Sequence, residues 1–413
     1  MKEKDILNLI IVGEVDHGKS TLIGRLLYDT GSIPEDRIKS IQEICQSFGK
    51  EMEFSFLVDH LKEEREKEMT IDTAQVFIKS KKRDYVIIDA PGHKEFIKNM
   101  LTGASQAEAG IIIVDANVGI GEQTQRHSFL LKLLGIKQII VAVNKMDLVD
   151  FSEKKFNEIK SQFEKFLSQI KLPVSFFIPI SAKEGDNVAE RSKRTKWYKG
   201  ETLIGALEKF PPAQPLSQKP FRFAVQDVYS FDEKEIIVGK VLSGEVKINQ
   251  KGLALPSKRK IEIKSIEIFG EERKKAEAEE SIGLTIKEKV FFDRGEVISD
   301  SENLPLLSSK FLAYIFWTSK NKANLEDEFL LSLGTQTVKA KFKEIRKRID
   351  SATLKILEKN AKKIEENEVG EVVIETEKPI VFERFNFLPP LGRFVIFSQV
   401  QPEGGGIIIS PLL

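Results

Sequence analysis

Two patterns of apolar positions divide the chain into two halves. In the first half, short continuous apolar runs alternate with segments that have helical spacing. The apolar runs cover 7–12, 85–88, 110–114, 139–143 and 174–180, and the helical segments cover 21–27, 127–134 and 153–170. Continuous apolar strands that alternate with helices are typical of a parallel sheet covered by helices on both faces. The first half is therefore predicted to be an α/β domain.

The second half shows the period-two alternation of half-buried strands. The strands predicted from this pattern cover 221–225, 245–248, 260–266, 371–376 and 393–397. Short strands separated by turns about every 8–12 residues are typical of small antiparallel barrels. Prolines between 210 and 220 indicate a linker before them. We expect an α/β domain over 1–213 and antiparallel β-barrels over 218–302 and 303–413.

Composition and charge narrow the class of protein. Of 413 residues, 41% are hydrophobic, which is enough for packed cores and excludes wholesale disorder. The formal net charge of +1 excludes a strongly basic protein, although a local patch for nucleic acid is compatible with it. Cys45 has no second cysteine to pair with, and no stretch approaches the roughly 20 apolar residues of a membrane helix. We expect a cytoplasmic protein.

The loop after the first strand carries a phosphate-binding motif. Residues 13–20, Gly-Glu-Val-Asp-His-Gly-Lys-Ser, fit the pattern G-x-x-x-x-G-K-[ST] between a strand and a helix. The glycines let backbone N–H groups turn toward phosphate oxygens, and the helix N-terminus adds its positive end. Lys19 is expected to reach the β- and γ-phosphates, and Ser20 to bind Mg²⁺. The residues predicted to hold the phosphates are Gly13, Val15, Asp16, His17, Gly18, Lys19, Ser20 and Thr21.

A second motif follows the strand at 85–88. Asp89-Ala90-Pro91-Gly92 stands at a strand end, and ligands of open α/β sheets bind at the carboxyl ends of strands. Asp89 is expected to hold Mg²⁺ through water, and the Gly92 N–H to sense a γ-phosphate. The motif is short, so its weight comes from this position in the chain.

Two further strand ends predict recognition of guanine. Asn144-Lys145-Met146-Asp147 follows the strand at 139–143, and Ser181-Ala182-Lys183 follows the strand at 174–180. The Asp147 carboxylate can accept hydrogen bonds from guanine N1–H and the N2 amino group, whereas adenine offers no such donor pair. Asn144 is expected to brace the loop, the Lys145 stem to lie along the base, and the Ala182 N–H to meet guanine O6. The predicted ligand is GTP or GDP.

This order of motifs resembles the translation-factor class of GTPases over most of the chain. Residues 58–72 resemble the first switch segment of that family, and 89–100 resemble the second. The resemblance implies that Thr70 binds Mg²⁺ together with Ser20 and Asp89, and that His93 lies beside the attacking water. Hydrolysis of a phosphoanhydride needs a side chain that orients the water, which agrees with that role for His93. The expected catalytic residues are His93, Lys19 and Thr70.

Within this class, several runs resemble the large, GTP-binding subunit of sulfate adenylyltransferase. The runs cover 123–130, 134–137, 144–151, 197–203, 221–228 and 348–350. The resemblance implies a regulatory GTPase that couples GTP hydrolysis to the formation of adenylyl sulfate and pyrophosphate from ATP and sulfate. It also implies a separate small catalytic subunit as partner, in a heterodimer or a larger assembly.

Other features resemble elongation factors and keep two alternatives open. Asp16-His17-Gly18 and residues 390–394 are similar to those factors, and Glu68-Met69 stands where the family has Gly-Ile. One alternative is a factor that delivers aminoacyl-tRNA, and the other is a stand-alone GTPase switch. Five basic residues within 191–199 fit either a contact with tRNA or a solvated loop.

Overall fold

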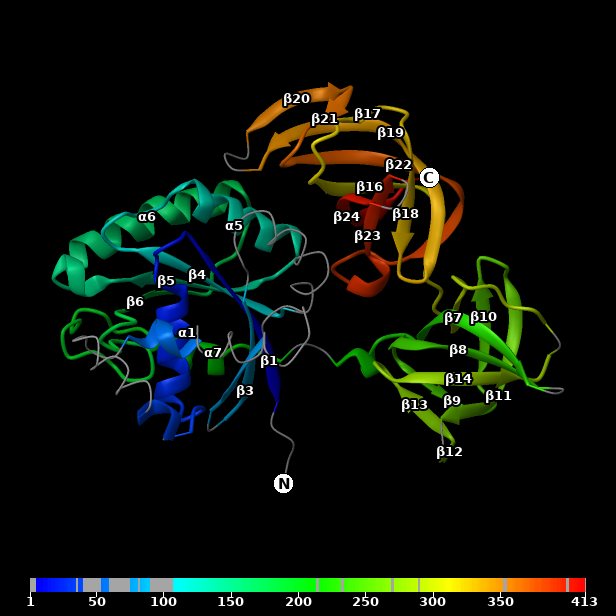
Figure 1. Ribbon diagram of the computed structural model, residues 1–413, viewed down its shortest axis with the longest axis horizontal. Helices are drawn as coiled ribbons and strands as arrows, with labels where there is room; N and C mark the ends of the chain where they lie inside the picture. Colours follow the sequence, from blue (N-terminus) through cyan, green and yellow to red (C-terminus); the bar gives the residue numbers. More distant parts are fainter. Residues whose placement is uncertain are drawn as a thin grey trace. The chain divides into compact units, whose positions relative to one another are not determined.

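The computed structural model divides into two compact units, one within residues 1–213 and one within 214–413 (Figure 1). It describes residues 5–34, 36–39, 53–58, 75–80, 82–89, 107–212, 215–231, 234–268, 271–288, 290–351, 355–398 and 401–412. In these residues no helix is both long and apolar enough to span a membrane. The domain boundaries expected from the sequence stay a prediction.

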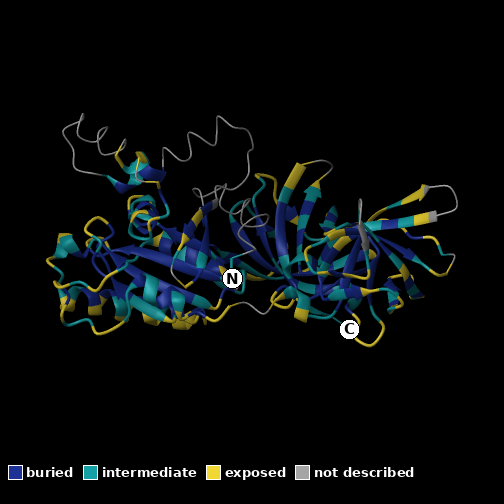
Figure 2. Cartoon of the chain, turned by 90° about the horizontal axis from the view of Figure 1, so that it is seen from below, coloured by how far each residue is buried: buried dark blue, intermediate teal, exposed yellow. Residues whose placement is uncertain are grey.

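The first unit is built on a six-stranded sheet with the order β2-β3-β1-β4-β5-β6. The strands are β1 (Ile6–Gly13), β2 (Gln75–Lys79), β3 (Asp84–Asp89), β4 (Ala109–Asp115), β5 (Gln138–Asn144) and β6 (Phe176–Pro179). Only the edge strand β2 runs antiparallel to its neighbour, so the sheet is mostly parallel, as predicted. Buried residues follow these strands in Figure 2.

Helices cover this sheet. They are α1 (Lys19–Asp29), α5 (Glu122–Leu133), α6 (Glu153–Gln169) and α7 (Leu203–Glu208), with the short 3-10 helix η2 (Met146–Val149) after β5. Alternate residues of β1, from Leu7 to Ile11, share one core with α1 and α7, whereas α5 packs on β1 and β4. Strands with apolar residues on both faces need this double cover, which is why their sequences read as continuous apolar runs.

The second unit consists of two antiparallel barrels of six strands, each closed by pairing of its first and last members. The first barrel contains β7 (Arg222–Phe231), β8 (Lys234–Ser243), β10 (Lys251–Leu255), β11 (Arg259–Ile268), β14 (Ser281–Ile286) and β15 (Val297–Asp300). Strand β12 (Glu271–Arg273) pairs antiparallel with β11, and β9 (Glu245–Lys247) pairs with β13 (Lys275–Glu277). The 3-10 helix η3 (Leu216–Gln218) precedes this barrel.

The second barrel is built from longer strands. It contains β16 (Leu306–Trp317), β18 (Glu328–Leu333), β19 (Gln336–Asp350), β22 (Glu368–Phe382), β23 (Arg393–Ser398) and β24 (Gln401–Pro411). Strand β20 (Ile356–Ala361) pairs antiparallel with β19, and β17 (Ala323–Asn324) pairs with β21 (Lys363–Ile364). The 3-10 helix η4 (Pro389–Leu391) precedes β23. The predicted fold class, an α/β domain followed by two β-barrels, is confirmed.

A buried ion pair joins the two barrels. The Arg222 side chain is 1% exposed, and its Nε and Nη2 donate to Glu383 Oε1 at 3.0 and 2.8 Å. Its Nη1 donates to the backbone oxygens of Phe221 and Asn303 at 2.9 and 2.8 Å. Burial raises the pKa of Glu383, and the Arg222 guanidinium opposes that rise. The guanidinium is therefore desolvated and hydrogen-bonded at the same time. Removing either Arg222 or Glu383 would leave the other buried without its partner, which costs free energy of folding.

We expect Arg222→Met to lower the free energy of unfolding by about 3–5 kcal/mol, because it leaves the Glu383 carboxyl buried without its partner. Arg222→Met/Glu383→Leu should be less destabilised than the sum of its single variants. Urea denaturation followed by circular dichroism measures both. Arg294→Met, at an exposed arginine of the same barrel, is the control. A single variant as stable as the wild type would contradict the expectation.

Candidate functional site

The strands that precede the predicted motifs end at one edge of the sheet. The parallel register pairs Ile11 with Asp89, Gly13 with Ile113, and Asp115 with Asn144, so β1, β3, β4 and β5 end side by side. The described loops after β1, β4 and β5 therefore leave the sheet at the edge at which open α/β sheets bind ligands.

The phosphate loop leaves β1 at Gly13 and enters α1 at Lys19. A Cβ on Gly13 would lie 2.4 Å from the Ile113 side chain, so β4 leaves room for glycine alone. Gly18 has φ +92°, and its left-handed backbone turns the chain into the helix. Lys19 Nζ donates to the backbone oxygens of Gly13 and Glu14 at 2.8 and 2.7 Å, which holds the ammonium over the loop. Ser20 and Thr21 follow in the first turn of α1, whose N–H groups have no partner inside the helix.

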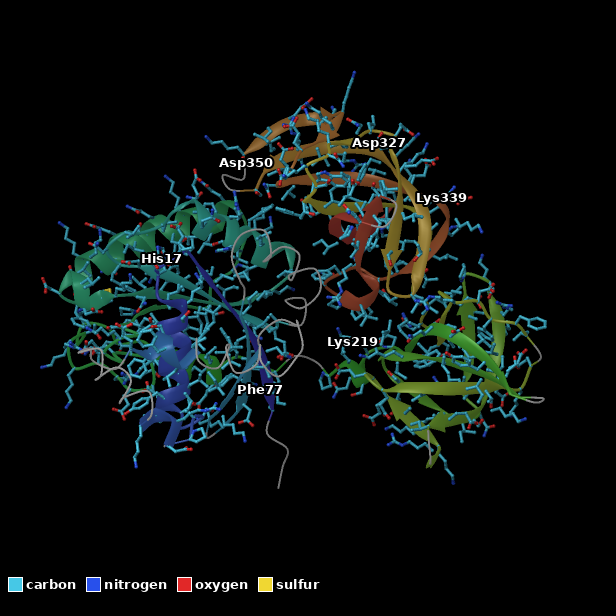
Figure 3. The ribbon with its side chains drawn as sticks, viewed as in Figure 1. His17, Phe77, Lys219, Asp327, Lys339 and Asp350 are labelled. Atoms are coloured by element: carbon cyan, nitrogen blue, oxygen red, sulfur yellow. The ribbon has the colours of Figure 1, made fainter. Side chains whose placement is uncertain are left out.

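His17 lies inside the domain and away from the loop's outer face. The residue, labelled in Figure 3, is 3% exposed. Its Nδ1 lies 3.4 Å from both the Ile113 oxygen and the Asp115 nitrogen. Burial lowers the pKa of His17, although the Ile113 carbonyl and the Glu14 carboxylate oppose the shift. The structure thus gives His17 a packing role for its side chain and leaves only its backbone on the loop. Val15 and Asp16, by contrast, are exposed on the loop.

A contact that the sequence analysis did not anticipate ties the phosphate loop to α5. Glu14 Oε1 accepts from the backbone N–H groups of Gln123 and Thr124 at 3.2 and 3.3 Å. Gly121, the residue before the helix, supplies no side-chain cap, and a Cβ there would lie 2.0 Å from the Glu14 carboxylate. Glu14 therefore caps α5 from a distant part of the chain, and a carboxylate favours the positive end of a helix. The sequence offered two signals of this contact: Gly121, which cannot cap the helix itself, and an acidic residue, Glu14, in the phosphate loop.

The two loops predicted to bind the base, 144–151 and 181–183, are called the base-binding loops below. Asn144, in the first of them, connects it to the phosphate loop and to the second. Its Nδ2 donates to the His17 oxygen at 2.9 Å, and its Oδ1 accepts from the Ala182 N–H at 2.9 Å. A Cβ on Gly18 would lie 2.5 Å from that Nδ2, so glycine is required for this approach. Three loops therefore meet at the side chain of Asn144, and its bracing role stays a prediction.

Lys145 and Asp115 form an ion pair beside this junction. Lys145 has φ +60°, and its Nζ lies 2.8 Å from Asp115 Oδ2. Burial alone would raise the pKa of Asp115, but hydrogen bonds from Lys145 and the Asn117 N–H outweigh it and hold the pKa below its ordinary value. A carboxylate on a neighbouring strand end therefore fixes the long Lys145 side chain.

Asp147 and Ser181 bring the two base-binding loops together. Ser181 Oγ donates to Asp147 Oδ1 at 2.6 Å and accepts from the Glu184 N–H at 3.2 Å. Asp147 is half-buried on η2, and Ser181 holds one of its two carboxylate oxygens. Lys183 is exposed, and its backbone oxygen accepts from Arg25 Nη1 at 3.4 Å.

Four of the predicted site residues are described incompletely or not at all. Thr70, Gly92 and His93 lie outside the described residues, and Asp89 is described only as the last residue of β3. The described part of the chain holds no group of three or more His, Cys, Asp or Glu residues arranged for a metal ion. The prediction of a Mg²⁺ site at Ser20, Thr70 and Asp89 therefore rests on the motifs.

Two family descriptions match the sequence. "Elongation factor Tu GTP binding domain" matches residues 4–223, and "GTP-eEF1A C-terminal domain-like" matches residues 310–409. Elongation factor 1-alpha of Pyrococcus furiosus is 39% identical over 99% of this chain and 98% of its own length. Elongation factor 1-alpha of Saccharolobus solfataricus is also 39% identical, again over 99% and 98%. Sulfate adenylyltransferase subunit 1 of Alteromonas mediterranea is 36% identical over 100% of this chain and 88% of its own length.

Proposed function

This chain belongs to the translation-factor family of GTPases, and we propose that it acts there as the regulatory large subunit of a sulfate adenylyltransferase. Membership of the family supports a general function for the chain, which is to bind guanine nucleotides and hydrolyse GTP. The finer function is GTP hydrolysis coupled to the formation of adenylyl sulfate and pyrophosphate by a separate small subunit.

The nucleotide roles follow from chemistry at the sheet edge. The backbone N–H groups at Gly18 to Ser20 and the Lys19 ammonium would bind the phosphates, since both donate to anionic oxygens. Ser20 and Thr70 would hold Mg²⁺, with Asp89 acting through water. The ion would neutralise charge on the β- and γ-phosphate oxygens. His93 would orient the attacking water.

The observation that carries base recognition is the ordered geometry of the two base-binding loops. Asn144 and Ser181 join these loops through side-chain hydrogen bonds of 2.9 and 2.6 Å. Asp147 then needs little rearrangement to accept from the two guanine donors, and a pre-organised acceptor loses less free energy on binding. This arrangement favours guanine nucleotides over adenine nucleotides at the site.

The sulfate proposal is supported by a relative of that name over the whole chain and by sequence runs that resemble the large subunit. Two of these runs, 144–151 and 197–203, are joined by a hydrogen bond of 3.0 Å from Trp197 Nε1 to the Phe151 oxygen. Another run, 123–130, lies on α5 and is mostly buried. It therefore reflects common packing rather than a surface for the small subunit.

Delivery of aminoacyl-tRNA is the second candidate function. The elongation factor 1-alpha relatives match over 99% of this chain, which favours it as strongly as the sulfate relative favours the first. The basic residues Arg191, Lys193, Lys196 and Lys199 are exposed, as contacts with an RNA backbone require. The chain's 2 Trp and 5 Tyr against 28 Phe favour core and protein-interface use over stacking of bases.

Two assays separate these functions. We expect GTP turnover, measured as phosphate release, to rise when a sulfurylase small subunit, ATP and sulfate are all present, and to stay basal when any one is omitted. Lys19→Ala should abolish the rise, because it removes the phosphate-binding ammonium. In the second assay, the GTP-bound protein should leave the ester of aminoacyl-tRNA as labile as in buffer. GTP-dependent protection of that ester would overturn the sulfate proposal and support tRNA delivery.

A further inference from the structure

The loop after β5 is held in an unfavourable backbone conformation. Lys145, Asp150 and Phe151 have φ values of +60°, +50° and +51°. Residues other than glycine rarely adopt this left-handed conformation, and it is most unusual for a bulky side chain such as that of Phe151. Such a conformation persists only where surrounding contacts enforce it. Because Asp147 lies on this loop, those contacts also control the predicted base-binding carboxylate.

Trp197 supplies one of these contacts from the segment 184–198. Its Nε1 donates to the Phe151 oxygen at 3.0 Å, while the Phe151 N–H donates to the Met146 oxygen at 2.8 Å. The indole also packs on Phe156 of α6, with ring centres 5.4 Å apart. Phe151, at the end of the strained loop, is thus hydrogen-bonded through both its backbone N–H and its backbone oxygen.

The same segment holds the loop that follows β6. Ser181 exchanges a backbone contact with Asp186, whose oxygen accepts from the Ser181 N–H at 3.2 Å. The Asp186 carboxylate accepts from Ser192 Oγ at 2.5 Å. Asn187 Nδ2 donates to the Pro179 oxygen and to Thr195 Oγ1, both at 2.8 Å. The position of Ser181, and through it that of Asp147, therefore depends on this segment.

The Arg194 guanidinium contacts Phe151 of the first loop directly and reaches the second loop through Asp186, which is bonded to Ser181. Its Nη2 also lies 3.7 Å from Glu184 Oε2. Its Nε donates to Asp186 Oδ1 at 3.2 Å, and its Nη2 donates to Asp186 Oδ2, which makes a two-pronged ion pair. Its Cζ lies 4.4 Å from the centre of the Phe151 ring, within the range of a cation–π contact. A planar guanidinium can pair with a carboxylate through two N–H groups and lie flat on an aromatic ring, whereas an ammonium is a compact point charge without that fork.

We propose that Arg194 is a positioning residue for guanine recognition, which ties the loop of Asp147 to the loop of Ser181 and thereby slows release of the bound nucleotide. This inference rests on the proposed guanine site, in which Asp147 binds the base. Arg194 itself contacts Asp186, Glu184 and Phe151, and none of these three residues is assigned a contact with the nucleotide. Its effect should therefore appear in nucleotide affinity and base choice, and the rate of hydrolysis of bound GTP should stay unchanged.

Arg194→Met tests the inference, because methionine keeps much of the apolar length and removes the ion pair and the cation–π contact. We expect dissociation of a fluorescent GDP analogue to become roughly 5- to 30-fold faster, as expected for the loss of one such charged contact set. The affinity ratio between GDP and inosine diphosphate, which lacks the C2 amino group, should fall toward 1. Single-turnover GTP hydrolysis at saturation should match the wild type.

Lys193→Met is the matched control, because Lys193 is an exposed cation one residue away for which the described residues provide no hydrogen bond or ion pair. It should leave dissociation and the GDP preference unchanged. Arg194→Lys should lie between Met and wild type, since it keeps charge without the planar fork. Should Arg194→Met fail to fold, Asp186→Asn removes the ion pair with Asp186 and keeps the contacts of Arg194 with Glu184 and Phe151. It is expected to produce a smaller shift in the same two quantities.

Wild-type dissociation and wild-type GDP preference in both Arg194→Met and Asp186→Asn would overturn the inference. Such a result would leave the guanine site standing, provided the wild-type protein prefers GDP to inosine diphosphate. A wild-type protein with no preference between these two nucleotides would instead refute the proposed base site. The two failures are therefore distinguishable in one set of measurements.

Discussion

Replacing His93 with alanine is expected to reduce GTP hydrolysis by roughly 10²–10⁴, the usual range for a group that positions or handles a proton in the transition state. GTP affinity should stay within a few-fold, because the predicted phosphate and base contacts come from Lys19, Asp147 and their loops. Single-turnover kinetics with GTP measures hydrolysis apart from nucleotide exchange. Glu68-Met69 stands where the family has Gly-Ile, so we expect the wild-type protein itself to hydrolyse GTP slowly. This is a further reason to use single-turnover kinetics.

His93→Gln is the matched variant, since a glutamine amide can also orient a water molecule. We expect it to retain more activity than His93→Ala at equal GTP affinity. The residue follows the end of β3, where Asp89 lies in register with Ile11 of β1, although His93 itself is outside the described residues. An alanine variant that hydrolyses GTP at the wild-type rate would remove His93 from the mechanism.

The elements and the order of the loops could be predicted from the sequence because their signals are local. Apolar runs marked the buried strands, and the helix predicted at 153–170 is α6, Glu153–Gln169. Period-two alternation at 260–266 lies within β11, Arg259–Ile268. The phosphate motif needs only a strand, a glycine turn and a helix, all close together in sequence. Asn144 and Ser181 could be predicted at strand ends for the same reason, because each directly follows an apolar run in the sequence.

Contacts between distant residues could not be predicted in this way. Glu14 caps α5 more than 100 residues later in the chain, and His17 turns its ring toward Ile113. Both residues belong to the phosphate motif. The motif predicts the course of the backbone but not the direction in which these two side chains point. Packing of α5 and β4 against the loop decides them, and no short sequence pattern encodes that packing.

The segment 184–198 shows the same limit for a whole loop. Its basic residues suggested either a contact with RNA or a solvated surface. In the structure, Arg194 pairs with Asp186 and lies over Phe151, so at least one of these charges has an internal role. Arg222 is a second example: alternation predicted a strand at 221–225, whereas the burial of Arg222 depends on Glu383, a residue of the other barrel.

Asp147→Asn is expected to shift nucleotide preference from GTP to xanthosine triphosphate. In this variant the amide N–H₂ faces the base and can donate to the xanthine C2 oxygen, whereas it meets the guanine amino group donor to donor. Loss of a hydrogen bond to a charged group costs roughly 1.5–3 kcal/mol, so GTP affinity should fall at least about tenfold. Ser181 Oγ donates to Asp147 Oδ1 at 2.6 Å, and the asparagine oxygen can keep that bond. The loop should therefore hold its position.

Competition of both nucleotides against a fluorescent GDP analogue measures the shift. Asp150→Asn is the matched control: it makes the same chemical change at an exposed carboxylate on the same loop, and asparagine tolerates the φ of +50° there. Ser181→Ala should weaken GTP binding and leave the preference for guanine, because it removes the brace and keeps the acceptor. Equal preference for GTP in Asp147→Asn and wild type would refute the assignment of guanine recognition to Asp147, since no other group proposed at this edge distinguishes an amino group from an oxygen at C2.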